Sequence, residues 1–496
     1  MVLSDRQCIC LDSRIGQLRD MVMLRRFLVV LIAISVATTF GQSMPAGRSV
    51  PAKPRLVFAH YFPPYPVSLD NAPPASDYYA TQYLNPFGEN GKHAAYGGLL
   101  RDRPIPREPR SGNWRAADLR DEVATAARYG IDGFGIDILT PHTDPQWVSA
   151  VPQLLLDAAA AVSPTFKIML QPDMSGEMAQ LTPTQLAAEI AYLAGQPAAF
   201  RLDDGRLVVS PVMAERHDAT WWKTFLDIMR ETFHTPVALV PLFLNPLPYI
   251  DSFAAISYGM SEWGGRNPAF NPVIGAPSER VRKVQQLGKI WMQPISVQDE
   301  RPNQAVYDEA ENTQNLRNTW LIAIDSKADW ALMVTWNDYS EGTAFAPSVK
   351  HGDSFLQICN YYAGLFKTGL APQSIHDRVV LTHRTQLVAT EPTYPTVSPM
   401  TLRAGSSPPR DTAEALTFLR APAEVTVRAG DRTQTCSVPA GVGLCLVALP
   451  QPLTADIRVD AVVSRAGHPV LAFTSPYPVV ARPYVQDLQY VAESQG

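Results

Sequence analysis

The sequence lacks a strong charge bias and the motifs of several enzyme classes. Lysine and arginine number 42 against 47 aspartates and glutamates, so the formal net charge is only −5. A nucleic-acid-binding protein usually carries a basic patch, so we expect no nucleic-acid partner. The nine histidines show neither His-x-His nor HExxH spacing. We therefore expect no metal and no other cofactor.

Cysteine is scarce, and its five positions predict one disulfide. Cys8 and Cys10 fall in an N-terminal leader, and Cys359 lies in the apolar, helix-like segment FLQICNYYAGLF, where a core thiol is expected. Cys436 and Cys445 flank SVPAGVGL between two strand-like runs, which favours a disulfide that staples a hairpin in an oxidising compartment. Metal ligation is disfavoured, because neither has a CxxC partner or a neighbouring histidine.

The N-terminus lacks an apolar run long enough to span a membrane. Two arginines precede an apolar stretch at residues 27–37 and then small and polar residues, which is the layout of a secretory signal peptide. About eleven apolar residues are too few for a span, which needs roughly 20. Residues 1–20 form a polar leader, so Met21 or Met23 is the expected start. We expect a secreted or periplasmic protein with no stable membrane span after signal cleavage; an uncleaved anchor is the alternative.

Short apolar segments alternate with amphipathic ones over residues 55–370. The expected strands begin at Arg55, Gly130, Phe166, Arg206, Pro236, Phe253, Lys289 and Asp329. Near-continuous apolar strands alternating with helices predict a parallel sheet covered on both faces, and eight such units predict a (β/α)8 TIM barrel. The link after the Pro236 segment is too short for a full helix. An open doubly wound sheet is the alternative, but AHYFPPYP replaces the glycine-rich phosphate turn after the first strand.

The pattern changes beyond Thr368. Short alternating strands separated by Gly, Pro and Asp turns predict a small all-β sandwich. At 496 residues the chain exceeds what one core usually serves. We expect a leader and signal peptide (1–44), a linker (45–54), a catalytic barrel (55–370) and a β-sandwich accessory domain (371–496). This last domain either binds glycans or braces the barrel; with no evident aromatic ladder, bracing is favoured. No oligomeric state is inferred.

The active site of such a barrel is built at the carboxyl ends of its strands. The residues at these ends are acids, amides and aromatics: His60, Tyr61, Asp137, Gln171, Asp173, Glu215, Tyr258, Glu262, Trp263, Gln293, Trp336, Asn337, Asp338, Tyr339 and Glu341. Lys and Arg are nearly absent from this set, which disfavours phosphorylated substrates. No GxSxG elbow is present either. The set favours sugars, whose hydroxyls pair with carboxylates and amides while their C–H faces stack on aromatic rings.

Several of these residues have a structural alternative. Asp137 and Asp173 are either ligands of substrate hydroxyls or members of a network that supports the catalytic pair. Glu215 is either a third functional acid or part of a surface loop. His60 is either a sugar ligand or a histidine satisfied within the barrel. Asp132, in the middle of its strand, is expected to be structural.

The last strand runs into an acid-rich segment, ALMVTWNDYSEGTAFAP. Glycoside hydrolysis needs two carboxyl groups that flank one bond. Within a continuing strand, Asp338 and Glu341 would point to opposite faces. If the strand stops near Trp336 and turns through DYSEG, both acids converge on the barrel mouth. The alternative is that Asp338 forms an Asx-turn and Glu341 starts a helix.

VFAHYF, GIDGFGIDI, FKIMLQPDM and TWNDYSEGTAFAP together resemble glycoside hydrolase family 71, the α-1,3-glucanases or mutanases. The most specific string is W-N-D-Y-x-E, which carries the catalytic acids in that family and implies Asp338 and Glu341 here. The same string is distantly similar to W-N-E-W-x-E-G of glycoside hydrolase family 99, the endo-α-mannosidases. SYGMSEWGG and SPVMAERH depart from the family 71 pattern.

The resemblance implies a secreted endo-acting α-1,3-glucanase that inverts the anomeric centre, with Asp338 as base and Glu341 as acid. Eleven of the other strand-end residues are then expected to bind the polysaccharide or oligosaccharide substrate: His60, Tyr61, Asp137, Asp173, Glu215, Tyr258, Trp263, Gln293, Trp336, Asn337 and Tyr339. The alternatives are an α-mannosidase of the family 99 kind and a catalytically silent glycan-binding barrel.

Overall fold

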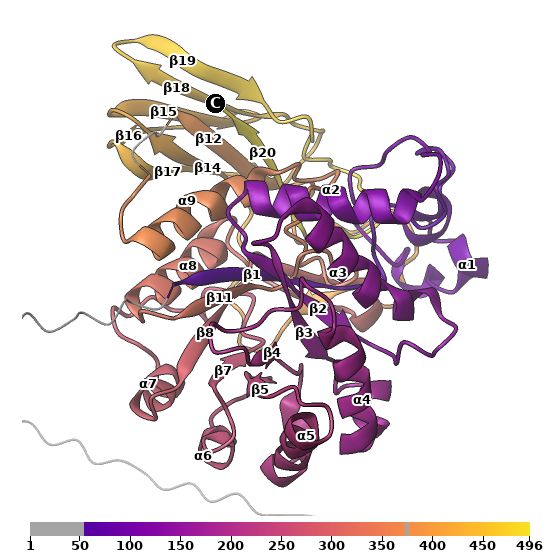
Figure 1. Cartoon of the computed structure of the whole chain (residues 1–496). Coiled ribbons are helices and arrows are strands. Elements are labelled where there is room, and N and C mark those ends of the chain that lie inside the picture. Colours follow the sequence, from indigo (N-terminus) through magenta and orange to yellow (C-terminus); the bar gives the residue numbers. More distant parts are fainter. Residues whose placement is uncertain (1–53, 373–375) are drawn as a thin grey trace, which may run out of the picture. The chain divides into compact units, whose positions relative to one another are not determined.

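The computed structural model describes residues 54–372 and 376–496 (Figure 1). The expected leader, signal peptide and most of the expected linker, with Cys8 and Cys10, lie outside the described residues. Within the described ranges, no helix is both long and apolar enough to cross a membrane.

A curled parallel sheet forms the centre of the fold (Figure 1). Its strands pair in the order β5-β4-β3-β2-β1-β11-β8-β7-β6. The bounds are β1 (Leu56–Tyr61), β2 (Gly133–Ile138), β3 (Lys167–Pro172), β4 (Leu207–Val209), β5 (Val237–Leu239), β6 (Leu242–Phe243), β7 (Gly259–Glu262), β8 (Ile290–Ile295) and β11 (Trp330–Met333). The end strands β5 and β6 are two halves of one segment, interrupted at Val240 and Pro241. The sheet thus returns on itself, and the prediction of a TIM-like barrel is confirmed.

Alternate residues of the strands face two different cores. Phe58, Met169 and Leu332 pack together inside the barrel. Val57 and Trp291 belong instead to the larger core that also contains helix residues. This alternation explains the near-continuous apolar runs, because both faces of a parallel sheet are buried.

Helices cover the outer face of the sheet. They are α2 (Trp114–Arg128), α3 (Val151–Val162), α4 (Pro183–Ala194), α5 (Ala219–Glu231), α6 (Ile250–Phe253), α7 (Glu279–Gln286), α8 (Gln314–Asp325) and α9 (Ser354–Thr368). Local sequence fixes several starts: Thr182 and Gln185 form a capping box on α4, and Asn113 and Asp218 cap α2 and α5. The single turn α6 lies in the link after the Pro236 segment, which the sequence showed to be too short for a full helix. The β1–α2 connection contains another single turn, α1 (Gly88–Gly91).

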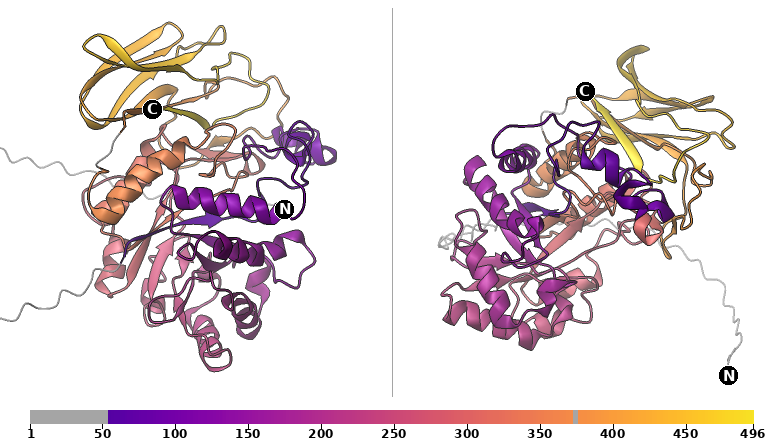
Figure 2. Two further views of the ribbon diagram at one scale, coloured as in Figure 1. Left: turned by 45° about the horizontal axis from the view of Figure 1, so that its top comes forward. Right: turned by 90° about the vertical axis from the view of Figure 1, so that its right-hand side faces the viewer.

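The C-terminal region forms two four-stranded antiparallel sheets, β17-β14-β12-β20 and β16-β15-β18-β19 (Figure 2). The bounds are β12 (Arg378–Arg384), β14 (Thr412–Leu419), β15 (Ala423–Ala429), β16 (Arg432–Val438), β17 (Gly441–Ala448), β18 (Val459–Arg465), β19 (His468–Thr474) and β20 (Tyr490–Gln495). Val379, Val425 and Ala461 belong to the core that the two sheets share. On the other face of the first sheet, Leu416 and Phe418 belong to the barrel's outer core. The predicted C-terminal β region is therefore present.

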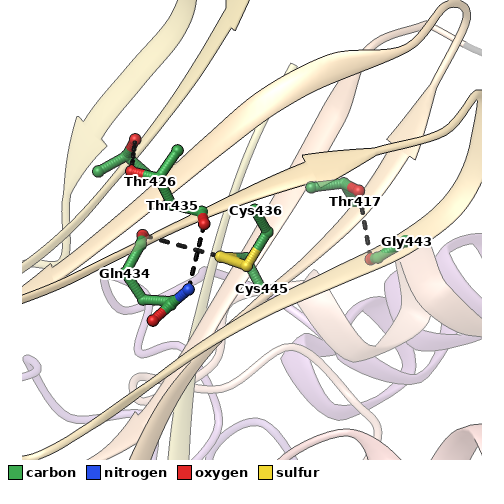
Figure 3. Close-up of a disulfide and its surroundings, with 7 residues drawn as sticks. All are labelled: Thr417, Thr426, Gln434, Thr435, Cys436, Gly443 and Cys445. Carbon is green, nitrogen blue, oxygen red and sulfur yellow. Dashed lines mark hydrogen bonds between the residues drawn. A yellow bond between two sulfur atoms is a disulfide. The ribbon is translucent and has the colours of Figure 1, made fainter.

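One disulfide joins Cys436 and Cys445, whose Cα atoms are 5.7 Å apart (Figure 3). Their strands, β16 and β17, follow one another along the chain but belong to different sheets. The sequence predicted a disulfide that staples a hairpin within one sheet. The bond instead links the two sheets. Cys359 is free and buried, as expected.

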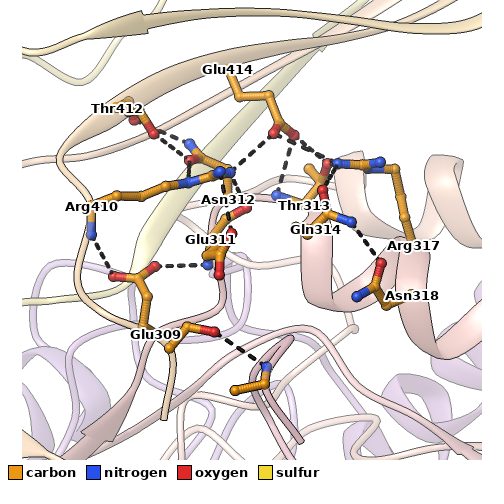
Figure 4. A network of polar contacts seen from close by, with 12 residues as sticks. Glu309, Glu311, Asn312, Thr313, Gln314, Arg317, Asn318, Arg410, Thr412 and Glu414 are labelled. Atoms are coloured by element: carbon orange, nitrogen blue, oxygen red, sulfur yellow. Dashed lines mark hydrogen bonds and ion pairs between the residues drawn. The ribbon is translucent and has the colours of Figure 1, made fainter. Parts of the chain in front are cut away.

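Polar contacts join the C-terminal region to the loop before α8 (Figure 4). Asn312 Nδ2 donates to the carbonyl oxygens of Thr382 and Thr412, at 3.0 and 3.1 Å. The buried Arg384 pairs with the buried Glu309 at 2.9 Å. A third, small sheet, β13-β10-β9, joins β13 (Thr401–Leu402) to β10 (Val306–Asp308) and β9 (Asp299–Arg301). The contacts that bracing requires are therefore present.

Candidate active site

A cavity of about 830 Å³ opens at the carboxyl ends of the barrel strands. This volume lies within the range of about 300–1,000 Å³ that is typical of ligand sites. Six of the predicted catalytic and substrate-binding residues line it, His60, Asp137, Asp173, Trp263, Asp338 and Glu341, as does the strand-end residue Glu262. The six come from β1, β2 and the segments that follow β3, β7 and β11, so the barrel brings together side chains from five parts of the chain.

The Asp338–Glu341 segment is a tight turn and not a continuation of β11. Asp338 Oδ1 accepts hydrogen bonds from the backbone N–H of Ser340 and of Glu341, at 3.0 and 3.2 Å, and from the Ser340 hydroxyl at 2.7 Å. Gly342 follows with φ +63°, and a Cβ there would come within 2.7 Å of the Gln489 side chain. Asp338 therefore forms the Asx-turn considered as an alternative and also lines the cavity with Glu341.

Other side chains of the motif point away from the cavity. The Trp336 indole donates to Glu122 Oε1 at 3.1 Å, and the Tyr61 hydroxyl donates to Glu122 Oε2 at 3.0 Å. Asn337 accepts a hydrogen bond from the backbone N–H of Phe62 at 2.7 Å, which fastens the motif to the end of β1. These buried residues hold the turn in place, and the structure does not bring them into the cavity.

Tyr339 is also buried outside the cavity, in a cluster with Tyr65 and Tyr79. Glu215 Oε1 accepts a hydrogen bond from the backbone N–H of Leu244 at 2.8 Å, so it supports a cavity-lining residue without lining the cavity itself. Gln293 faces the helices, where its Oε1 accepts a hydrogen bond from an indole of the same strand at 2.8 Å.

Tyr258 lies at the opposite end of the barrel. It lines a second cavity of about 320 Å³, formed at the amino ends of β1, β4, β8 and β11. The Arg206 guanidinium lies 5.0 Å from the centre of its ring. The position of Tyr258 therefore does not support the prediction that this residue binds substrate at the mouth of the barrel.

Glu341 carries a carboxyl group that favours the protonated form. Its Oε1 lies 2.6 Å from Arg301 Nη1, while its Oε2 is buried without a hydrogen-bond partner. Burial and the nearby Asp338 raise the pKa of Glu341 to about 8, against the opposing charge of Arg301. Burial also raises the pKa of Asp338, although its turn hydrogen bonds oppose the shift. The two carboxyl groups repel each other when both are ionised, so they titrate as a pair.

His60 and Asp137 form a second titratable pair. His60 Nδ1 lies 3.0 Å from Gln171 Oε1 and therefore donates to it, while Nε2 lies 3.6 Å from Asp137 Oδ2. Burial lowers the pKa of His60, but Asp137 and Gln171 raise it more, so the net shift is upward. Burial raises the pKa of Asp137 to about 6, against the charge of His60. Asp137 Oδ1 is buried without a partner, which leaves an acceptor for a ligand.

Four arginines line the cavity, although Lys and Arg are nearly absent from the strand-end residues that the sequence singled out. These arginines are Arg266, Arg280, Arg301 and Arg403. Three of them are held by acids: Arg280 pairs with Glu262 at 2.7 Å, Arg301 with Asp299 at 2.6 Å, and Arg403 with Asp308 at 2.6 Å. The lining acids number seven: Asp137, Asp173, Glu262, Asp299, Asp308, Asp338 and Glu341. Most of the positive charge is thus neutralised within the protein.

The fourth arginine, Arg266, is 3% exposed. Its Nη1 donates to the carbonyl oxygens of Trp263 and Gly264, at 2.9 and 3.1 Å, whereas Nε and Nη2 are buried without partners. Sequence reasoning missed these arginines because none lies at the end of an expected barrel strand: Arg280 belongs to α7, Arg301 to β9, and Arg403, in the C-terminal region, is 95 residues from Asp308. Within 54–372 and 376–496, no group of three or more His, Cys, Asp or Glu side chains has a metal-binding arrangement.

Solved structures of low similarity include a GH99 endo-α-mannosidase from Bacteroides thetaiotaomicron. It is 15% identical, with a TM-score of 0.46 over 64% of this chain and 98% of that chain. A second structure of the same enzyme, with BIS-TRIS-propane, is 17% identical, with a TM-score of 0.46 over 62% of this chain and 97% of that chain.

Sequence comparison identifies the family. The chain is 24% identical over 399 residues to the glucan endo-1,3-alpha-glucosidase agn1 of Schizosaccharomyces pombe, which covers 73% of this chain and 86% of the relative. The profile of glycosyl hydrolase family 71 matches residues 109–486, well over half of the chain. The chain is therefore a glycoside hydrolase and belongs to glycosyl hydrolase family 71.

Proposed function

We propose that this glycoside hydrolase cleaves internal bonds of α-1,3-glucan, with Asp338 and Glu341 as its catalytic carboxyl groups. The observation that carries the proposal is that both acids of the W-N-D-Y-x-E motif line one cavity at the barrel mouth of a family 71 chain. The name of the S. pombe relative supports this choice of glucan and linkage.

Glu341 is the general acid in this proposal. With a pKa of about 8 it holds its proton at neutral pH, as an acid that protonates a leaving oxygen must. The proton passes from Glu341 to the glycosidic oxygen as the bond between that oxygen and the anomeric carbon breaks. Arg301, 2.6 Å from Glu341, stabilises the carboxylate that remains.

Asp338 is the general base. Its Oδ1 accepts three hydrogen bonds within the turn, which fixes the carboxyl group and leaves Oδ2 for a water molecule. Asp338 takes a proton from this water while the water oxygen bonds to the anomeric carbon on the face opposite the leaving group. One displacement of this kind inverts the anomeric configuration. Proton exchange with solvent then restores both carboxyl groups.

Asp137, Asp173, His60 and Trp263 bind the sugar in this mechanism. The unpartnered Asp137 Oδ1 supplies an acceptor for a hydroxyl group, and the half-buried Trp263 ring, 5.0 Å from the His60 ring, supplies an apolar surface for a C–H face.

The proposal extends to location and to domain roles. The signal-like residues 25–37 and the Cys436–Cys445 disulfide favour an extracellular or periplasmic protein. Residues 55–370 would form the catalytic barrel, and residues 371–496 would brace it through contacts such as Arg384–Glu309.

The test is to incubate the mature protein separately with α-1,3-glucan, α-1,4-glucan and α-mannan, and to measure reducing ends and product lengths. We expect reducing ends from α-1,3-glucan alone, with products of several lengths because internal bonds are cut. Release from α-mannan in place of α-1,3-glucan would favour the mannosidase alternative. Binding of α-1,3-glucan without any release would favour the glycan-binding alternative.

A further inference from the structure

One wall of the cavity is built jointly by two segments that are distant in sequence. The loop after β7 contributes Phe270, and the segment after β13, in the C-terminal region, contributes Arg403. Phe270 lines the cavity although 46% of it is exposed, and Leu244, also lining, is 52% exposed. Large apolar side chains that stay exposed inside a cavity indicate a surface meant for a ligand.

The Phe270 ring is held in place from one side. A Cβ at Gly405, where φ is +82°, would lie 3.1 Å from Phe270 Cζ, so the C-terminal backbone packs closely against the ring. The backbone N–H of Phe270 donates to Asn267 Oδ1 at 3.0 Å, and that of Ala269 donates to the Ser407 hydroxyl at 3.2 Å. These contacts fix the ring against the C-terminal segment while its exposed surface remains open to the cavity.

The Arg403 side chain is also held in place by hydrogen bonds. Its backbone N–H donates to the Tyr307 carbonyl at 2.8 Å, its Nε to Asp308 Oδ2 at 2.6 Å, and its Nη2 to Asp299 Oδ1 at 3.4 Å. Even so, 35% of the side chain is exposed. The guanidinium is therefore oriented in advance and still has surface available to a ligand.

A chain of ion pairs relates this wall to the proposed acid. Arg403 contacts Asp299, Asp299 pairs with Arg301, and Arg301 pairs with Glu341. Two charged side chains thus separate Arg403 from Glu341. A ligand group at Arg403 would consequently lie near the reacting carboxyl groups without touching them.

The chemistry of this wall suits a neutral sugar ring. An exposed aromatic ring stacks on the C–H face of a sugar, and a fixed guanidinium donates to its hydroxyl oxygens. An anionic ligand is disfavoured, because seven acids line the cavity against four arginines.

We propose that Phe270 and Arg403 form an outer subsite, which binds a sugar residue of the glucan chain beyond the residues that flank the cleaved bond. The C-terminal region is thereby part of the substrate-binding surface as well as a brace. The inference rests on the proposed function and adds to it a site for a longer chain.

The test compares α-1,3-gluco-oligosaccharides of increasing length with wild-type protein, Phe270→Ala and Arg403→Ala. For long chains we expect each substitution to lower kcat/KM roughly 10-fold. For the shortest oligosaccharide that is cleaved, we expect a change within about twofold, because it does not reach the subsite. Phe270→Leu keeps the apolar bulk but not the ring and should behave like Phe270→Ala, whereas Phe270→Tyr should retain activity. Arg403→Lys should fall between wild type and Arg403→Ala.

Phe87→Ala is the matched control, because Phe87 is 67% exposed but does not line the cavity. Unchanged activity of Phe270→Leu on long chains, or an equal loss at every chain length, would overturn the subsite. Failure of the proposed function would give a different result, because wild-type protein would then release no reducing ends from α-1,3-glucan. In that case the same length series, made from the glycan that wild-type protein cleaves, decides the subsite.

Discussion

The cavities at the two ends of the barrel both contain aromatic and charged residues, but they differ in whether their buried polar atoms have hydrogen-bond partners. At the carboxyl ends of the strands, Asp137, Arg266 and Glu341 each keep a buried polar atom without a partner. At the amino ends, the smaller cavity also holds aromatic and charged residues, but Arg206 pairs with Asp204 at 2.7 Å. None of the described residues that line this second cavity has a buried polar side-chain atom without a partner.

This difference separates a candidate site from a cavity of similar composition. A buried polar atom without a partner in the protein costs free energy, and in a cleft such an atom can pair with a ligand. The arrangement at the mouth also raises the pKa of Glu341 to about 8. Perturbed carboxyl groups in a cleft are typical of catalytic sites.

The largest expected effect comes from neutralising the two acids at the mouth. Asp338→Asn and Glu341→Gln should each lower kcat on α-1,3-glucan by roughly 10²- to 10⁴-fold, because each removes one proton transfer. Reducing-end release measures the loss, and circular dichroism melting curves check that the fold is kept. Turnover close to that of wild type by either variant would refute the assignment.

The pH dependence of kcat/KM should report the ionisation of Glu341, the proposed general acid. Because Glu341 must hold its proton, kcat/KM should fall about tenfold per pH unit above about pH 8. The measurement is kcat/KM between about pH 5 and 10, and a profile that stays flat up to about pH 9.5 would contradict the role.

Melting curves at each pH are the control for that profile. The buried Glu122 also has a pKa of about 8 in the folded protein, above that of an unfolded glutamate at about 4.3. The folded state therefore binds more protons, and the free energy of unfolding falls as the pH rises toward 8. Kinetics should accordingly be measured well below the melting temperature.

Asp137→Ala should have a smaller effect, mainly on substrate binding. It removes the unpartnered acceptor Oδ1, so kcat/KM should fall roughly 10-fold, with most of the change in KM. The substitution also removes the charge that raises the pKa of His60, so that pKa should fall in an NMR titration. Unchanged KM would show that Asp137 has only a structural role.

The smallest effect is expected at the amino end of the barrel. Arg206→Ala and Asp204→Ala break an ion pair at the protein surface, and such pairs contribute little to stability. Activity should stay within about twofold of wild type, and Tm should change by roughly 2 °C or less. A tenfold loss of activity would mean that the second cavity also serves the reaction, and the comparison would fail.

The fold could be read largely from the sequence, because buried parallel strands produce apolar runs wherever they occur. Strand boundaries were less certain, and this had a consequence at Tyr258. The expected strand began at Phe253, which placed Tyr258 near its end, whereas β7 begins at Gly259 and Tyr258 lies at its start. An error of a few residues in the expected strand boundary thus placed the Tyr258 side chain at the wrong end of the barrel.

The site was predictable where a strand end or the motif fixed the side chain, as for His60, Asp137 and Glu341. The directions in which the Trp336 and Tyr339 side chains point were not predictable. Both residues follow β11, where a turn sets these directions and the alternation of side chains along a strand no longer applies. Phe270 and Arg403 were missed for a different reason: loops carry no periodicity, and only tertiary structure brings the C-terminal segment to the mouth.

The most direct test of the central claim follows the product anomer by NMR. Wild-type protein is mixed with soluble α-1,3-gluco-oligosaccharides, and spectra are recorded before mutarotation equilibrates the anomers. We predict that the β-anomer of the new reducing end appears first, because one displacement at an α-linkage inverts the carbon. Appearance of the α-anomer first, or absence of any product, would contradict the account.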